Sequence, residues 1–448
     1  MARAFCFIAV GLISGWTAGC AEDAGRSADP RPNIVLIVVD DLGWDDFGTG
    51  AAADLRTPHI DALAAGGVRF TSAYSAAPLC SPARAGLLTG RYPQRFGHEN
   101  NTGSVGHQHD ARIGLALTER TLADALRSVS YATGMIGKWH LGVRQEYHPM
   151  RRGFQEFFGF LAGHHAYHQF SEKPHNPILL GFDPIRGSGY LTDAFSRQAV
   201  AFVDRHAHER FFLMLAYSAV HEPLVADPAR VARLPEGPRR DFAAVLAAVD
   251  DGVGELVASL QRHAIEDETL IVLTSDNGAS GAGAGLRGGK ASLYEGGVRV
   301  PLIARWPGRL PGGIRYAEPV STLDLFATAS AAAGVVAPDG SAPLDGIDLL
   351  PYVRGEIDGA PHETLYWRVG GQHAMRAGHW KLHWRDGRAS TLYDLAADPG
   401  ESRNLAAVHP ERVRSMHTAY AQWEAPLEQP AWEWLPGQPG ATLTPAPK

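Results

Sequence analysis

The 448-residue chain has only three cysteines, and two of them, Cys6 and Cys20, lie within its first twenty residues. Cys80 is therefore the only thiol in the body of the chain, which excludes a framework of structural disulfides there. The chain also lacks an excess of basic residues: its net charge is −7, which does not indicate a nucleic-acid or membrane-surface protein. We find no internal repeat and no nucleic-acid-binding module. An anionic substrate would therefore have to be attracted by local positive charge.

Residues 1–20 contain Arg3, an apolar run from Phe5 to Ile13 and a final group of small residues before Cys20. This pattern indicates an export signal, because the apolar run is too short to span a bilayer. Ala-Gly-Cys20 also matches the end of a bacterial lipoprotein signal, but Thr17 stands where that pattern usually has leucine. Lipidation of Cys20 and plain cleavage nearby therefore both stay open.

Residues 21–32, rich in Ala, Asp, Gly and Pro, are the predicted tether after this signal. We expect an exported protein of a bacterium, either periplasmic or a lipoprotein of the outer membrane or cell surface. Contact with a membrane would then be only through the lipid anchor.

Continuous apolar runs, rich in β-branched residues, predict strands that are buried on both faces of a parallel sheet at 33–39, 211–217 and 270–274. Helical periodicity and end signals predict helices at 57–66, 121–128, 241–260 and 323–333. Together these segments predict the α/β class, with a large central sheet, mostly parallel or mixed, flanked by helices.

Beyond residue 360 the pattern changes to short, alternating, aromatic segments at 364–369, 373–376, 380–385 and 391–394, with a helix starting near Pro410. These segments predict a small antiparallel sheet. Because the length exceeds one ordinary domain, we expect a catalytic domain at 33–355, a smaller C-terminal α+β subdomain at 356–428 and a tail at 429–448.

Polar residues follow the predicted strands where each one ends. Asp40 and Asp41 follow the first strand, and Asp276 and Asn277 follow the strand at 270–274. In open α/β sheets ligands bind at this carboxyl edge. Carboxylate and amide oxygens suit Ca²⁺ or Mg²⁺ rather than zinc or copper. A solvated turn or helix cap is the alternative for each pair alone.

Basic residues end two further runs: Lys138 and His140 follow the strand-like segment at 131–137, and His221 follows the run at 211–217. Lys138 and His140 share a face if the backbone is extended, so both could point into one site. A surface charge or a buried core histidine is the alternative for each residue taken singly.

The stretch from Leu79 to Arg91 reads Leu-Cys-Ser-Pro-Ala-Arg-Ala-Gly-Leu-Leu-Thr-Gly-Arg. Pro82 suits a first helical turn, which predicts that Cys80 starts a helix and that Arg84, one turn on, faces the same way. Unpaired N–H groups and partial positive charge at such a helix end suit an anion. The alternative is a buried cysteine that packs as a small hydrophobe.

The order Cys80-x-Pro82-x-Arg84, followed by Leu-Thr-Gly-Arg91, resembles the signature of the type I sulfatases of the alkaline phosphatase superfamily. In that family a formylglycine-generating enzyme oxidises the cysteine to Cα-formylglycine, whose hydrated aldehyde is the nucleophile. The resemblance implies an alkaline-phosphatase-like fold and a sulfuric ester hydrolase. It also implies a calcium ion, with magnesium as the alternative, held by Asp40, Asp41, modified Cys80, Asp276 and Asn277.

The same resemblance implies a set of catalytic residues: Cys80, Arg84, Lys138, His140, His221 and Lys290. One hydroxyl of the hydrated aldehyde would attack sulfur, while His221 and Lys290 hold the sulfate ester and supply a proton to the leaving oxygen. His140 would remove a proton from the second hydroxyl. Arg84 and Lys138 would stabilise the alkoxide and the sulfate charge, so Lys138 also binds substrate.

Residues 91–101 and 163–168 resemble segments of bacterial sulfatases that act on polysaccharides, which implies a sulfated carbohydrate or an aryl sulfate as substrate. Candidate sugar contacts are His98, Asn100, His164 and His165, with ordinary loop residues as the alternative. Two other functions stay open: a phosphate or phosphonate ester hydrolase of the same fold, and an inactive glycan-binding lipoprotein in which Cys80 is not converted.

Overall fold

The central strand of the fold is β1 (Asn33–Val39), and all seven of its residues are buried. It pairs in parallel with β10 (Phe211–Tyr217) on one side and with β11 (Thr269–Ser275) on the other. The computed structural model describes residues 1, 30–48, 55–103, 109–170, 176–280 and 285–433. The predicted export signal with Cys20, most of the tether and the end of the tail lie outside these residues.

In the described part of the chain, β1 belongs to a ten-stranded sheet with the order β13-β2-β12-β11-β1-β10-β4-β5-β7-β8. The inner strands run parallel, whereas β11 pairs with β12 and β5 pairs with β7 in antiparallel fashion. Because β4, β10, β1 and β11 are parallel, their carboxyl ends lie at one edge of the sheet. The other strands of this sheet are β2 (Val68–Phe70), β4 (Ala132–Lys138), β5 (Glu156–Phe160), β7 (Leu179–Leu180), β8 (Asp183–Pro184), β12 (Leu302–Arg305) and β13 (Ile314–Tyr316).

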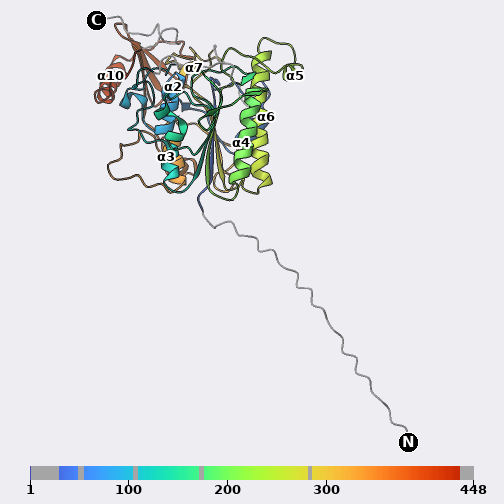
Figure 1. Cartoon of the computed structure of the whole chain (residues 1–448). Coiled ribbons are helices and arrows are strands. Elements are labelled where there is room, and N and C mark those ends of the chain that lie inside the picture. The colour runs from blue at the N-terminus through green and yellow to red at the C-terminus, as the bar shows by residue number, and fades with distance from the viewer. Residues whose placement is uncertain (2–29, 49–54, 104–108, 171–175, 281–284, 434–448) are drawn as a thin grey trace. The chain divides into compact units, whose positions relative to one another are not determined.

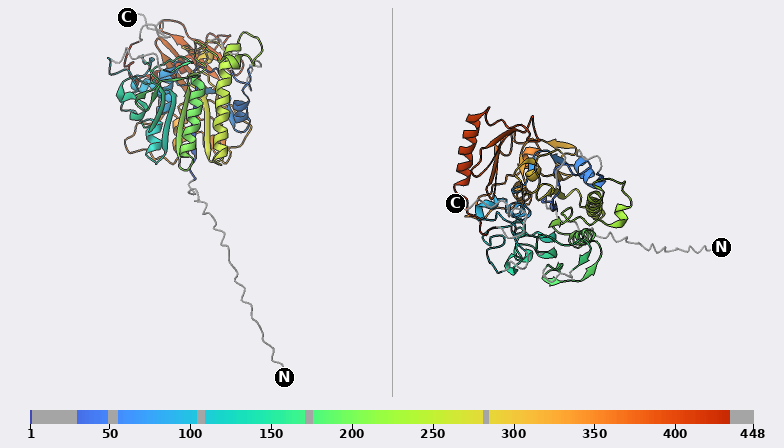
Figure 2. Two further views of the ribbon diagram at one scale, coloured as in Figure 1. Left: turned by 45° about the vertical axis from the view of Figure 1, so that its right-hand side comes forward. Right: turned by 90° about the horizontal axis from the view of Figure 1, so that it is seen from above.

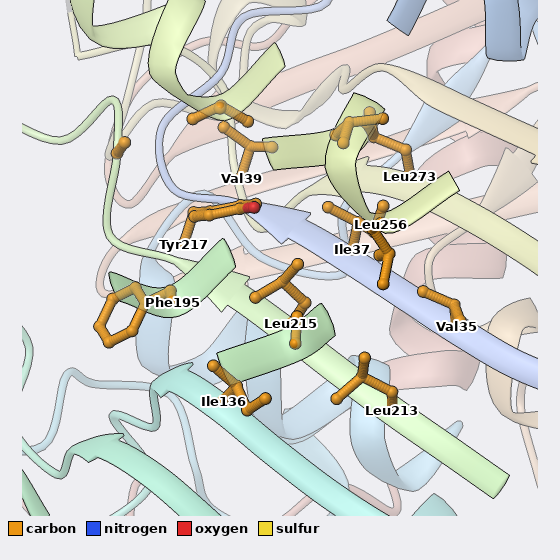
Figure 3. Close-up of a cluster of buried hydrophobic side chains, with 14 of the residues drawn as sticks. Val35, Ile37, Val39, Ile136, Phe195, Leu213, Leu215, Tyr217, Leu256 and Leu273 are labelled. Carbon is orange, nitrogen blue, oxygen red and sulfur yellow. The ribbon is translucent and has the colours of Figure 1, made fainter. Parts of the chain in front are cut away.

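Helices cover both faces of this sheet (Figure 1). Alternate side chains of β1 point to opposite faces, as the period of a strand requires. Val35, Ile37 and Val39 pack with α1 (Pro58–Ala65), α4 (Leu191–His206) and α6 (Arg240–Arg262), and Figure 3 shows part of this cluster. Ile34, Leu36 and Val38 pack with α2 (Cys80–Thr89), α3 (Leu122–Arg127) and α8 (Asp324–Ala332). Each fully buried aliphatic side chain contributes about 1.5–3 kcal/mol.

A separate antiparallel sheet is formed by β15 (Thr364–Val369), β16 (Gln372–Ala377), β17 (Trp380–Arg385) and β18 (Thr391–Asp394). One face packs against α10 (Pro410–Glu424), where Leu382 and Leu392 meet Met416 and Tyr420. Trp367 and other side chains of the opposite face pack with Leu79, directly before Cys80, and with Val298 of α7 (Glu295–Val298). Figure 2 shows this sheet beside the larger one. The small sheet therefore packs against the segment that carries the cysteine.

Short elements complete the described fold. They are β3 (Ala73–Tyr74), β6 (Gln169–Phe170), β9 (Gly187–Ser188), β14 (Val320–Ser321), α5 (Pro228–Val231), α9 (Leu350–Val353), and the 3₁₀ turns η1 (Pro93–Phe96), η3 (Gln145–Tyr147) and η4 (Pro149–Arg151). None of the helices in the described ranges is long and apolar enough to cross a membrane.

The predicted α/β class, with a helix-flanked mixed sheet and a small C-terminal antiparallel sheet, is confirmed. The domain boundaries at residues 355 and 428 stay a prediction. Helix α4 and strand β5 were not predicted. The condition for a shared face of Lys138 and His140, an extended backbone, is not met, because β4 ends at Lys138 and His140 has a φ of 61°.

The start of the predicted tail packs against the segment after η1. Ala431 donates its backbone N–H to Gly97 C=O, and Trp432 is only 4% exposed. The Trp432 ring lies edge-on to His98, with 4.8 Å between centroids. Ala431 and Trp432 therefore pack against the segment that holds Gly97 and His98.

Candidate active site

Four potential ligand residues meet at the carboxyl edge of the large sheet. One side-chain atom from each of Asp40, Asp41, Cys80 and Asp276 lies within 4.8 Å of the others, and all four residues are buried. Asp41 has a φ of 61°, a conformation that Asp tolerates better than most residues. Its backbone N–H donates to Asp276 Oδ1 at 3.2 Å, which ties the end of β1 to the end of β11.

Cys80 is the first residue of α2, as predicted, and only 1% of its surface is exposed. Its Sγ lies 3.5 Å from Asp40 Oδ1 and 3.9 Å from Asp41 Oδ1. Burial raises the pKa of the thiol to about 12, although Lys138 and Lys290 act in the opposite direction. The unmodified thiol is therefore protonated near neutral pH and is a weak nucleophile as it stands.

Three cationic side chains neutralise the three carboxylates. Arg84 is fully buried and donates from Nε to Asp276 Oδ2 at 2.8 Å and from Nη1 to the Lys138 carbonyl at 2.7 Å. Lys138 Nζ lies 2.6 Å from Asp40 Oδ2, and Lys290 Nζ lies 2.8 Å from Asp41 Oδ1. Paired charges of this kind are what allow so many ionisable groups to be buried together.

The carboxylates differ in their affinity for protons. Burial and then the nearby Asp276 raise the pKa of Asp40 to about 7, against the effect of Lys138. Burial also favours protonation of Asp41 and Asp276, but neighbouring cations outweigh it and lower the pKa of both below the ordinary value. Lys290 is the main cation at Asp41, and Arg84 is the main cation at Asp276.

The two predicted catalytic histidines are neutral near pH 7. Burial, followed by Lys138 and Arg84, lowers the pKa of His140 well below its usual value. Burial, followed by Lys138 and Lys290, lowers the pKa of His221 to about 4. His221 donates from Nδ1 to the Glu222 carbonyl, so its Nε2, which lies 3.8 Å from Asp41 Oδ2, is the basic nitrogen facing the site.

The four candidate sugar contacts fall into two groups. His164 is exposed, and its ring lies 5.7 Å from that of His221 between centroids, so it borders the site. His98 is 0% exposed and its Nε2 lies 2.7 Å from Ser81 Oγ. Asn100 donates to the Trp432 carbonyl, and His165 is 3% exposed and packs on Phe160. In this structure these last three residues offer almost no surface to a sugar.

Some residues of the site were not predicted. Ser280 donates from Oγ to Asp41 Oδ2 at 2.5 Å, and Ser81 donates to the His140 carbonyl at 2.7 Å. Ser75 donates to the Asp276 carbonyl at 2.5 Å and itself accepts, at its own carbonyl, a hydrogen bond from Trp367 Nε1 of the small sheet. A serine hydroxyl gives no local sign of a partner in a distant segment, so only the tertiary structure reveals these contacts.

Gly278 explains how α7 approaches the end of β11. A Cβ at this position would lie 2.0 Å from the Gly296 carbonyl oxygen. The glycine therefore allows the Gly278 N–H to reach the Gly297 carbonyl at 3.0 Å. This close contact places the start of α7 directly beside Asn277.

The donor set fits a hard divalent cation. The Asn277 amide donates from Nδ2 to Asp41 Oδ1 at 2.7 Å and to the Gly278 carbonyl at 2.9 Å. Its Oδ1 is buried, and no described residue donates a hydrogen bond to it. A buried amide oxygen beside Asp40, Asp41 and Asp276 is a ligand set that Ca²⁺ and Mg²⁺ prefer.

Comparison with known proteins shows the family. The Sulfatase family model matches residues 32–335, and the model for the C-terminal part of N-sulphoglucosamine sulphohydrolase matches residues 289–422. The chain belongs to the sulfatase family, as its motifs indicated, and it is a sulfuric ester hydrolase.

Three similar proteins illustrate the match. N-acetylgalactosamine-6-sulfatase of Sus scrofa is 35% identical over 81% of this chain and 74% of its own length. Arylsulfatase A of Homo sapiens is 34% identical over 88% of each chain. The crystal structure of Ps i-CgsB in complex with k-i-k-neocarrahexaose is 34% identical, with a TM-score of 0.83, over 90% of this chain and 94% of that one.

Proposed function

We propose that this sulfatase removes sulfate from a sulfated carbohydrate with a nucleophile made from Cys80. The observation that carries the proposal is the position of Cys80, buried at the start of α2 with Sγ 3.5 Å from Asp40 and amid three cationic side chains. Its thiol is protonated at neutral pH because burial raises its pKa. Conversion to formylglycine would supply a hydroxyl nucleophile at this position.

A carbohydrate substrate is supported by what similar proteins act on or bind. One is named for N-acetylgalactosamine 6-sulfate, and another was solved with k-i-k-neocarrahexaose. Membership of the family favours sulfate esters over the phosphate or phosphonate esters that the sequence left open. The presence of two histidines with buried or half-buried rings beside the cluster also favours catalysis over mere glycan binding.

We propose that Asp40, Asp41, Asp276 and Asn277 hold a divalent cation together with modified Cys80, calcium in preference to magnesium. When bound, the cation would polarise a sulfate oxygen and favour ionisation of a neighbouring hydroxyl. The buried, unpartnered Asn277 Oδ1 and the carboxylates around it support this assignment.

The chain's own side chains divide the remaining work. Arg84 and Lys138 stabilise negative charge beside Cys80, where their own charges are held by Asp276 and Asp40. His140 is neutral and so is able to take a proton. Lys290 and His221 bind the sulfate ester at Asp41, and the negative charge of that ester would raise the pKa of His221 so that it can protonate the leaving oxygen.

We also propose that residues 1–20 direct export and that Cys20 carries a lipid, which would place the enzyme where external polymers are found. This part of the proposal rests on the sequence pattern alone. A formylglycine-generating enzyme would be the partner during maturation.

The experiment combines mass spectrometry with turnover. Trypsin should release the peptide from Phe70 to Arg84, and in active protein its mass should correspond to an aldehyde in place of the thiol. Cys80→Ala should abolish sulfate release from sulfated polysaccharides while circular dichroism and the unfolding transition stay those of the wild type. Full activity in protein whose Cys80 is an unmodified thiol would refute the nucleophile. Hydrolysis of aryl sulfates with no release from any carbohydrate would refute the substrate class.

A further inference from the structure

The catalytic cluster opens into a cavity of about 610 Å³ that shares Asp41 and Ser280 with the site. Its walls come from the residues after β10, from α5, and from the start of α6. Helices α5 and α6 are labelled on the right of Figure 1. The volume is in the range of pockets that hold drug-sized ligands, about 300–1,000 Å³. A disaccharide is a ligand of this size.

The cavity also offers apolar surface. Leu224, Val231 and Phe242 contribute to its lining, and Leu224 and Phe242 are anchored on the large core cluster. The C–H faces of sugar rings pack on such surfaces, while polar groups around them fix orientation. A sugar attached to a sulfate held at Asp41 would extend along this wall.

The charges of the cavity are unevenly balanced. Both of its guanidinium groups are already paired: Arg239 Nη2 lies 2.6 Å from Asp46 Oδ1, and Arg240 pairs with Glu236. Arg239 also covers the Phe242 ring, 4.8 Å from its centroid. These arginines therefore have little free positive charge to offer an anion.

In the described part of the chain, two carboxylates of the cavity lining have no cationic partner. Glu222 and Asp241 are exposed, and within the described residues neither side chain has a hydrogen bond or an ion pair. The cavity thus has an excess of negative charge, directly beside a site that must bind a negatively charged sulfate ester. An anionic group on the adjoining sugar would meet like charge here.

We infer that this cavity binds the sugar next to the sulfated one and selects an adjoining sugar that carries no anionic group. The inference rests on the proposed carbohydrate substrate and adds the chemistry of the adjoining sugar. The enzyme accepts a neutral hexose or N-acetylhexosamine at this position. It disfavours a uronate or a second sulfated sugar.

The size of the discrimination follows from Coulomb's law. Two like unit charges about 6 Å apart in bulk water repel by an amount that corresponds to about a threefold change in an equilibrium or rate constant. Each of the two carboxylates should therefore contribute about threefold. The effect should shrink as salt rises, because the Debye length falls to about 8 Å at physiological ionic strength and to about 3 Å at 1 M.

The test uses pairs of sulfated oligosaccharides that differ only in the adjoining sugar, which is neutral in one and carries a uronate or sulfate in the other. Sulfate release gives the ratio of kcat/KM for the two substrates, and an aryl sulfate is measured alongside. The wild type should prefer the neutral neighbour about tenfold at low salt. Glu222→Gln and Asp241→Asn should each move that ratio about threefold toward the anionic substrate.

Glu363→Gln is the matched control, because Glu363 is an exposed carboxylate before β15, outside the cavity lining. It should leave the ratio unchanged. A wild-type preference for the anionic neighbour, or a ratio that neither cavity variant moves, overturns the inference while the proposed function stands. If only the aryl sulfate is hydrolysed, the proposed function fails and the inference falls with it.

Discussion

A buried cluster of charge joins the small C-terminal sheet to the catalytic part of the chain. Lys381 of β17 lies with its Nζ 2.8 Å from Glu295 Oε1 and 3.2 Å from Glu401 Oε1, and all three side chains are 0% exposed. Tyr74 donates to the other oxygen of Glu295 at 2.7 Å. Glu401 in turn accepts a hydrogen bond from the backbone N–H of Glu295 at 2.7 Å. Lys381 therefore pairs with both buried carboxylates, and Arg299 adds a longer ion pair to Glu295, with 3.5 Å between Arg299 Nη1 and Glu295 Oε2.

Replacing Lys381 by methionine keeps most of the aliphatic stem but removes this cation. Breaking a buried ion pair by deleting one partner costs about 3–5 kcal/mol, because the remaining charge is left uncompensated. We expect Lys381→Met to lose about that much free energy of unfolding at pH 8. Urea unfolding followed by tryptophan fluorescence measures it, since Trp367, Trp380 and Trp384 belong to the same sheet.

The loss should depend on pH in a defined direction. Burial, opposed by Lys381 and assisted by Glu295, raises the pKa of Glu401 to about 7 from an ordinary value of 4.5. In the wild type this group binds its proton more tightly when folded, so its contribution to stability is full below about pH 4.5 and is lost as pH rises toward 7. Removing Lys381 raises that pKa further. The variant should therefore be closer to the wild type at pH 5 than at pH 8.

Two further variants test this expectation. Glu401→Gln added to Lys381→Met removes the unpaired charge of Glu401 and should restore a large part of the lost stability. Arg388→Met removes an exposed cation from the turn after β17 and should change stability by no more than about 0.5 kcal/mol. A loss below about 1 kcal/mol for Lys381→Met, or a loss independent of pH, would show that the cluster does not hold the sheet in place.

Three other predictions concern activity. Arg287 donates to Tyr393 Oη and to the Glu401 carbonyl, both at 2.9 Å. Because hydrogen bonds from charged groups contribute about 1.5–3 kcal/mol, Arg287→Ala should loosen the loop that carries Lys290 and lower kcat/KM about tenfold. Unchanged kinetics would contradict this role. His221→Ala should slow the hydrolysis of sulfate esters with poor leaving groups by about 10²–10⁴ and that of activated aryl sulfates much less. Measurements of kcat on a series of leaving groups test this, and equal losses across the series speak against proton donation. Removing divalent cations with a chelator should abolish turnover, and adding back Ca²⁺ should restore it more fully than Mg²⁺; activity that survives complete metal removal is the contrary result.

Much of the fold follows from local signals in the sequence. The runs at 33–39 and 211–217 are strands with those bounds, because continuous apolar β-branched residues fit a strand covered on both faces. Thr121 caps α3 through a capping box with Asp124, which explains why the start of this helix could be predicted from the sequence. Sheet order was not readable, since it depends on which strands meet after long connections.

The site likewise contains residues whose positions could be predicted from the sequence and residues whose positions could not. The polar ends of parallel strands had to meet, and the structure brings Asp40, Asp41, Lys138 and Asp276 together. His98 carried the same sequence signal as His164, yet it lies under Trp432 more than 300 residues later in the chain. Its burial depends on a long-range contact that no local pattern encodes. The same holds for Lys381, whose partners come from two other segments.

The burial of Cys80 also sets an order of events in the life of the protein. With 1% of its surface exposed at the start of a fully buried helix, the thiol is out of reach of any other enzyme once the chain has folded. The conversion we propose must therefore act on the nascent or unfolded polypeptide, ahead of the collapse of the two sheets around α2. A cell that lacks the converting enzyme at that stage would accumulate folded but inactive protein. Such protein could be converted only after it unfolds.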